Sequence, residues 1–122
     1  MNKLTFTMEN YLEAIFELAA TTGAARLTDI AARMSVTKST ANAAMSSLAE
    51  RGLIENHRYS QIRLTDDGKK MASAVAEKHV VIRKFFNEIL EIDDETADED
   101  ACAIEHVISD KSIDAMRRHF TA

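Results

Sequence analysis

The scarcity of residues that interrupt helices is the strongest constraint on the fold of this chain. The 122 residues include no proline and only three glycines, at positions 23, 52 and 68. Proline and glycine are the residues that helix interiors tolerate least, so helices are expected to dominate and the glycines to mark breaks. The sequence therefore predicts a mainly α-helical protein of about one domain in length, with room for a small appended lobe.

Hydrophobic periodicity gives the order of elements in the first half of the chain. Apolar residues at helical spacing predict an amphipathic helix over residues 7–20. A short helix over 27–34 and another over 37–51, which opens on a threonine suited to capping, follow after turns. Alternating runs at 53–56 and 61–64, separated by a polar tip, predict a β-hairpin.

The second half reads as helices only. Thr65 is the expected cap of a long helix, and Asp93 or Asp94 is the expected cap of a helix that runs to about Val107. A last short helix is expected from Ser109 onward. The long helix has an apolar stripe with steps of three or four residues, formed by Met71, Val75, His79, Ile82, Phe86 and Ile89. We therefore expect two domains, at residues 1–65 and 66–122.

Helix, turn, helix and hairpin occur in the order of a winged helix-turn-helix DNA-binding domain. In such domains the start of the second helix meets base edges and phosphates in the major groove. The small side chains of Ala41, Ala43 and Ala44 would allow close approach, and Arg63 in the hairpin would touch the DNA backbone or minor groove. The predicted DNA contacts are Thr37, Lys38, Ser39, Thr40, Asn42 and Arg58.

The charge is divided unevenly between the two halves. Residues 1–64 hold seven Lys/Arg and six Asp/Glu, a net charge of +1. Residues 65–122 hold eight Lys/Arg and fourteen Asp/Glu, a net charge of −6, and the two halves together give −5. An acidic lobe suits cation binding, a partner interface or only a solvated face. With so little positive charge in the first half, a monomer should bind DNA weakly, and a homodimer on a palindromic operator would double the contacts.

The segment Cys102-Ala103-Ile104-Glu105-His106 carries the clearest chemistry. In a helix, Cys102, Glu105 and His106 lie at i, i+3 and i+4, so a thiol, a carboxylate and an imidazole share one face. These are the side chains that bind transition metals. They cannot complete a site alone, because further ligands must come from other elements.

With these motifs the chain resembles the diphtheria toxin repressor and manganese transport regulator family of metal-dependent repressors. The resemblance covers nearly the whole chain, from FTMENYLEAI at 6–15 to ACAIEHVISD at 101–110. It implies an N-terminal domain that binds operator DNA and following helices that dimerise and hold divalent metal. It also implies metal-activated repression of metal homeostasis genes, and no enzymatic activity.

The resemblance also implies the ligand set. Glu105 and His106 match ligands shared by both branches of the family, and His79 matches a histidine used in both. Cys102 matches the iron branch, where the manganese branch has a glutamate, and Glu13 matches a manganese-branch ligand. The expected ligands are Asn10, Glu13, His79, Cys102, Glu105 and His106.

The chain departs from the iron branch at three positions. Asn10 stands where that branch has methionine and the manganese branch aspartate, and Arg83 and Asp98 stand where the iron branch's second site has glutamate and histidine. Arg83 cannot bind a metal, so that second site is expected to be altered or absent. A thiolate favours softer ions, so Fe(II) is the preferred ion, with Mn(II) and Zn(II) left open.

Two other functions remain open from sequence. Cys102 could sense oxidation in a winged-helix regulator that needs no metal, and a Cys/Glu/His set could in principle activate water in a metallo-hydrolase.

A single cysteine fits a reducing cytoplasm. Neither a signal peptide nor an apolar run of the ~20 residues that span a bilayer is visible, so no membrane association is expected.

Overall fold

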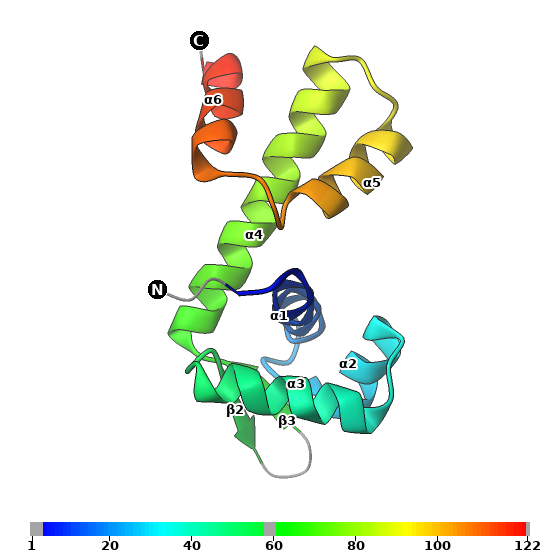
Figure 1. Ribbon diagram of the computed structural model, residues 1–122, viewed down its shortest axis with the longest axis vertical. Coiled ribbons are helices and arrows are strands. Elements are labelled where there is room, and N and C mark those ends of the chain that lie inside the picture. The colour runs from blue at the N-terminus through cyan, green and yellow to red at the C-terminus, as the bar shows by residue number, and fades with distance from the viewer. Residues whose placement is uncertain (1–3, 58–60, 122) are drawn as a thin grey trace. The chain divides into compact units, whose positions relative to one another are not determined.

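The computed structural model describes residues 4–57 and 61–121, in which helices predominate (Figure 1). Three short strands form one sheet. The predicted mainly helical fold class is confirmed. The chain divides into two compact units between Ser73 and Ala74, inside the fourth helix, whereas the sequence predicts a division at the start of that helix. No helix in the described part of the chain is both long and apolar enough to cross a membrane.

Three helices build the core of the first unit. They are α1 (Phe6–Leu18), α2 (Leu27–Met34) and α3 (Lys38–Glu50), close to the predicted ranges and, for α2, identical to it. Their apolar faces meet in one cluster, whose fully buried large side chains include Leu12, Ile15, Ile30, Met45 and Leu48. Burial of each such side chain contributes about 1.5–3 kcal/mol, which holds the three helices in place.

The turn between α2 and α3 sets the angle of the helix-turn-helix. Ser35 adopts a left-handed conformation (φ 58°), and the N–H of Val36 bonds to the carbonyl of Ala31 at 3.0 Å, which ends α2. The Thr37 side chain then accepts a hydrogen bond from the N–H of Thr40 at 3.1 Å and caps α3, as predicted.

A three-stranded antiparallel sheet completes this unit. Its strands are β1 (Ala25–Arg26), β2 (Ile54–His57) and β3 (Gln61–Leu64), in the order β1-β3-β2. In β3, Ile62 is buried and lies opposite Ala25 on one side and Asn56 on the other. The predicted hairpin is therefore confirmed, whereas β1, two residues long, is too short to show any alternation in the sequence.

The start of α4 (Asp66–Lys84) is joined tightly to the end of α3. The Thr65 hydroxyl accepts a hydrogen bond from the N–H of Gly68 at 3.0 Å and donates one to the carbonyl of Gly52 at 2.7 Å. A Cβ atom on Gly68 would lie 1.9 Å from the carbonyl oxygen of Leu53. Gly68 is therefore required by close packing against backbone, not by an unusual conformation.

The second unit contains the rest of α4, the π-helical turn η2 (Phe85–Ile89), α5 (Asp94–Ile104) and α6 (Asp110–Thr121). Its core is smaller and joins α4, α5 and α6. The buried members are Val81, Ile82, Ala101 and Ile113, with Phe86, Ile104, Ile108 and Met116 packed against them.

The predicted stripe on α4 is correct only in part. Val75 and Ile82 are buried, but Met71 is 39% exposed and Ile89 is 43% exposed. Ala72 takes the buried position beside Met71. The wider turn of η2 rotates the residues that follow Lys84, so a constant helical period does not predict the exposure of Ile89.

The two last helices are capped at their first turns. The Asp93 carboxylate accepts hydrogen bonds from the N–H and the hydroxyl of Thr96, both at 3.0 Å, and these bonds hold the pKa of Asp93 below its ordinary value. Ser109 likewise accepts from the N–H of Ser112 at 3.1 Å. Of the two residues predicted as the cap of α5, the structure has Asp93, and Ser109, predicted as the start of the last helix, caps α6; α5 ends at Ile104 rather than near Val107.

Candidate metal centre and DNA-reading helix

Three side chains with metal-binding chemistry come together in the second unit. His79 comes from α4, Cys102 from the last turn of α5, and Glu105 from the residue after that helix. Each offers one ligand atom, and these atoms all lie within 4.8 Å of one another. Two elements that are far apart in sequence thus contribute an imidazole nitrogen, a thiol sulfur and a carboxylate oxygen to one small volume.

Local backbone structure explains the position of Glu105. The N–H of Glu105 bonds to the carbonyl of Ala101 at 2.9 Å, and its backbone stays right-handed helical although α5 ends at Ile104. The i, i+3 relation between Cys102 and Glu105 therefore survives the early end of the helix. The buried Ala101 anchors this turn in the core of the second unit.

Glu105 is the one charged residue found buried among those the structure describes, with no exposed surface. Its two carboxylate oxygens face different imidazoles: Oε2 lies 3.5 Å from Nδ1 of His79, and Oε1 lies 3.4 Å from Nε2 of His106. Taking a carboxylate out of water is costly unless positive charge or hydrogen-bond donors surround it. The surroundings of Glu105 therefore suit a cation.

The donor set fits a divalent transition metal. Imidazole, thiolate and carboxylate are the usual protein ligands of Fe(II), Co(II) and Zn(II), and the separations are small enough for one ion to reach all three. Cys102 is exposed, which leaves a route for the ion to enter, while Glu105 is closed off from solvent. The structure brings together His79, Cys102, Glu105 and His106 of the six predicted ligands.

The other two predicted ligands lie on α1, in the first unit. Asn10 and Glu13 are half-buried and stand three residues apart, so they share one side of α1. Their part in a metal site remains a prediction.

His79 makes one contact that the sequence did not indicate. Its Nε2 atom lies 2.8 Å from Oδ1 of Asp98, on α5. The two residues are nineteen positions apart and on different helices, so no local spacing could have revealed the pair. In the sequence, Asp98 stands out as a residue one turn before Cys102 on the same helix face and as the residue that replaces a histidine of the iron branch.

The predicted DNA-reading residues lie at the start of α3, in the first unit. Lys38, Ser39 and Asn42 are exposed, as a groove-facing surface requires. Thr37 and Thr40 are also exposed, but the Thr37 hydroxyl is engaged with the N–H and hydroxyl of Thr40, so part of its chemistry serves the cap. Arg58 lies outside the described residues.

One feature of the predicted reading surface is wrong. Ala41 has no exposed area and belongs to the core, so it packs inward rather than allowing the helix to approach DNA. The period of α3 turns Ala41, Met45 and Leu48 to the same buried side. Ala43 is exposed and Ala44 half-buried, on the remaining face.

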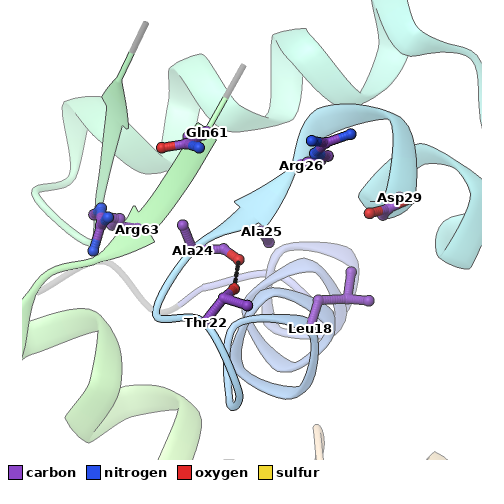
Figure 2. Close-up of a pocket in the computed structure, with 8 residues that line it drawn as sticks. All are labelled: Leu18, Thr22, Ala24, Ala25, Arg26, Asp29, Gln61 and Arg63. Atoms are coloured by element: carbon purple, nitrogen blue, oxygen red, sulfur yellow. Dashed lines mark hydrogen bonds between the residues drawn. The ribbon is translucent and has the colours of Figure 1, made fainter. Parts of the chain in front are cut away.

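A hollow of about 370 Å³ lies between the end of α1, the start of α2 and strand β3. Figure 2 shows Arg26 and Asp29 on the α2 side and Gln61 and Arg63 on β3. Arg63, a predicted contact to the DNA backbone or minor groove, is exposed here. The carboxylate of Asp29 stands among the same lining residues as the two arginines, so the hollow has mixed charge and is not an anion pocket.

Comparison with protein families matches both parts of the chain. Residues 3–62 match the N-terminal DNA-binding domain of iron-dependent repressors, and residues 65–121 match the metal-binding and dimerisation domain of the same family. Among individual relatives, the transcriptional regulator MntR of Escherichia coli O6:H1 is 34% identical over 110 residues, covering 90% of this chain and 70% of the regulator. The HTH-type transcriptional regulator MntR of Lysinibacillus sphaericus is 32% identical, with coverage of 92% and 80%.

Solved structures agree with these matches. T. acidophilum IdeR superposes with a TM-score of 0.81 at 26% identity, over all of this chain and 56% of that one. ScaR with bound Zn2+ superposes with a TM-score of 0.82 at 27% identity, over 93% of this chain and 53% of the ScaR chain. The chain thus spans about half the length of the solved regulators it matches. It belongs to the iron-dependent repressor family, whose members are metal-dependent, DNA-binding transcriptional regulators and not enzymes.

Proposed function

We propose that this protein is a transcriptional repressor whose binding to operator DNA requires a divalent metal ion. The observation that carries the proposal is the cluster of His79, Cys102 and Glu105, whose ligand atoms lie within 4.8 Å of one another inside the segment matched by the metal-binding domain. The buried Glu105 carboxylate adds weight, because a bound cation would offset the cost of its burial.

The full ligand set extends beyond this cluster. His106 lies 3.4 Å from Glu105 and can join the same centre or an adjacent one that shares the Glu105 carboxylate. Asn10 and Glu13, on α1, are proposed as ligands because their positions match ligand positions of the family. With ligands on α1 as well as on α4 and α5, a bound ion would favour one arrangement of the two recognition helices in a dimer, which is a shift of population toward the DNA-binding state.

We propose Fe(II) as the activating ion, with Mn(II) as the alternative. The thiolate of Cys102 favours softer ions and strengthens Fe(II), Co(II) and Zn(II) binding relative to Mn(II). The alternative has support from similar solved structures that are named as manganese regulators, and from Glu13. Asn10 supplies a neutral oxygen in place of a carboxylate, so it should weaken the site or shift its selectivity.

The DNA partner is proposed to be a palindromic operator bound by a homodimer, near genes of metal homeostasis. Thr37, Lys38, Ser39, Thr40 and Asn42 of α3, with Arg58 of the hairpin tip, would make the contacts in each half-site. The dimer is needed because the first 64 residues carry only one more basic than acidic residue. Such a regulator would act on the chromosome, so we expect it in the cytoplasm.

The test is a DNA-binding titration with metal-free protein and with one ion at a time, under anaerobic conditions for Fe(II). Metal-dependent binding that Cys102→Ala and His106→Ala abolish would support the proposal. Binding that persists in chelator and is lost on treatment with peroxide would favour instead a metal-independent regulator that senses oxidation through the exposed Cys102.

A further inference from the structure

His79 lies between two carboxylates, and each faces a different ring nitrogen. Nε2 is 2.8 Å from Oδ1 of Asp98, which is the distance of a good hydrogen bond, and Nδ1 is 3.5 Å from Oε2 of Glu105. The two nitrogens of an imidazole point away from each other, so one ring cannot present both to the same ion. The contact with Asp98 therefore decides which nitrogen is left for the metal centre.

Asp98 itself stands outside the centre. Within the described residues, the groups of His, Cys, Asp and Glu whose ligand atoms lie within 4.8 Å of one another include His79, Cys102 and Glu105 but not Asp98. Its side chain is 61% exposed, whereas Glu105 has no exposed surface. Asp98 thus touches the ring from the side opposite to the cluster.

We propose that Asp98 is a positioning residue of the metal centre: it accepts a hydrogen bond from Nε2–H of His79 and so presents Nδ1 to the ion. This inference rests on the proposed metal-dependent function. A carboxylate that accepts from the second nitrogen of a metal-binding histidine fixes its tautomer and ring orientation and raises its basicity. The residue that replaces a histidine of the iron branch would therefore support a ligand and would not be one.

The hydrogen bond to Asp98 helps to fix the orientation of the ring, because His79 lies outside the apolar core of the second unit. His79 is half-buried, with 22% of its side chain exposed, on a helix surface rather than inside the apolar core. A histidine side chain on a helix can occupy more than one rotamer. The hydrogen bond to Asp98, from α5, restricts that freedom and leaves Nδ1 facing the Glu105 carboxylate, which belongs to the same cluster as Cys102.

The experiment uses Zn(II) as the probe and compares three variants of the whole chain. Asp98→Ala removes the acceptor, Asp98→Asn keeps an acceptor oxygen without the charge, and Glu95→Ala removes an exposed carboxylate from the same helix as a matched charge control. Zn(II) affinity is measured by competition with a chelator. Long-range 15N NMR of the Zn(II)-loaded wild type, with a His79→Gln variant for assignment, identifies the bound nitrogen.

We expect His79 to bind through Nδ1, with Nε2 protonated. Asp98→Ala should weaken Zn(II) binding by about 10- to 100-fold, Asp98→Asn should lose less because it keeps an acceptor oxygen without the charge, and Glu95→Ala should stay close to the wild type. Binding through Nε2, or an equal loss in Asp98→Ala and Glu95→Ala, would overturn the inference and leave the proposed function intact. A wild type that binds no Zn(II), Fe(II) or Mn(II) would overturn the proposed function itself.

Discussion

At the scale of single residues, Glu105 is the side chain whose burial is most costly and whose proposed role as a metal ligand explains that burial. A carboxylate with no exposed surface is placed where both of its oxygens meet imidazoles. In the proposed function that arrangement is a site kept ready for a cation. A substitution of Glu105 should therefore act through the loss of its buried charge rather than through the loss of an apolar contact.

Replacing Glu105 with glutamine tests this directly. The side chain keeps its size but loses the charge and one acceptor, so metal affinity should fall at least tenfold, about 1.4 kcal/mol. Wild-type protein with metal at 100 times its Kd should gain about 2.7 kcal/mol of stability, measured by denaturant unfolding with and without Zn(II). Glu105→Gln should gain much less, and Glu95→Gln, at an exposed position, should gain as much as wild type. An equal gain in both variants would remove Glu105 from the site.

Cys102 sets the choice of ion in the proposed function. Cys102→Glu replaces a soft thiolate with a hard carboxylate, so affinity for Zn(II) and Co(II) should fall and affinity for Mn(II) should rise relative to them. Competition titrations with the three ions measure the change in ratio. Cys102→Ala is the control, because it should weaken binding of the softer ions without improving that of Mn(II). An unchanged ratio in Cys102→Glu would mean that the thiol does not contact the ion.

At the scale of elements, the join between α3, the hairpin and α4 depends on one glycine. Gly68→Ala would press a methyl group onto the carbonyl of Leu53, which accepts a hydrogen bond from the N–H of Thr65 at 3.1 Å. Overpacking of this kind costs about 1–3 kcal/mol. Urea unfolding of Gly68→Ala should show that loss, whereas Ser73→Ala, an exposed position on the same helix, should change stability little. Equal stability of the two variants would contradict the close approach of Gly68 to Leu53.

The cap of α5 predicts a pH dependence. Because the folded-state pKa of Asp93 is lowered by its bonds to Thr96, its contribution to stability is present above the unfolded pKa of ~4 and is lost as the pH falls through the folded value. Asp93→Ala should therefore be less stable than wild type at neutral pH, and the difference should shrink below about pH 4. Urea unfolding at several pH values measures it. A difference that stays constant to low pH would show that the charge of Asp93 plays no part.

The elements also show what the sequence could and could not predict. Caps at Thr37 and Thr65, and a cap at Asp93 or Asp94, were predicted because capping depends on local residue type and spacing. The exposure of Ile89 was not predicted, because η2 interrupts the regular helical period from which the apolar stripe of α4 was inferred. Strand β1 was missed because its two residues are defined by their partners Ile62 and Gln61, far along the chain.

At the scale of the whole molecule, some parts of the candidate site could be predicted from the sequence and others could be found only in the structure. Cys102 and Glu105 are neighbours on one turn, so spacing alone predicted their shared face. His79 sits in an apolar stripe, where a histidine usually belongs to the core, and only the resemblance to the family made it a candidate. The pairing of His79 with Asp98 depends on how α5 packs against α4 and could be found only in the structure.

Dimerisation also belongs to this scale. The segment matched by the dimerisation domain exposes large apolar side chains, among them Val80 at 52%, Leu90 at 51% and Val107 at 74%. A charged substitution such as Val80→Glu should weaken self-association, because it places a charge on one of these exposed apolar positions. Analytical ultracentrifugation checks this, with Lys111→Glu as an exposed control. If Val80→Glu dimerises as wild type does, this position lies outside the interface.

Metal-dependent DNA binding is tested by selecting DNA from a random pool with the protein loaded with Fe(II), and then titrating the selected sequence with and without metal. We predict a palindromic sequence, an affinity at least tenfold lower in chelator, and loss of this difference in His106→Ala. A change of about 1.4 kcal/mol in binding free energy corresponds to that factor. Equal affinity for the selected DNA in metal and in chelator would contradict metal-dependent repression.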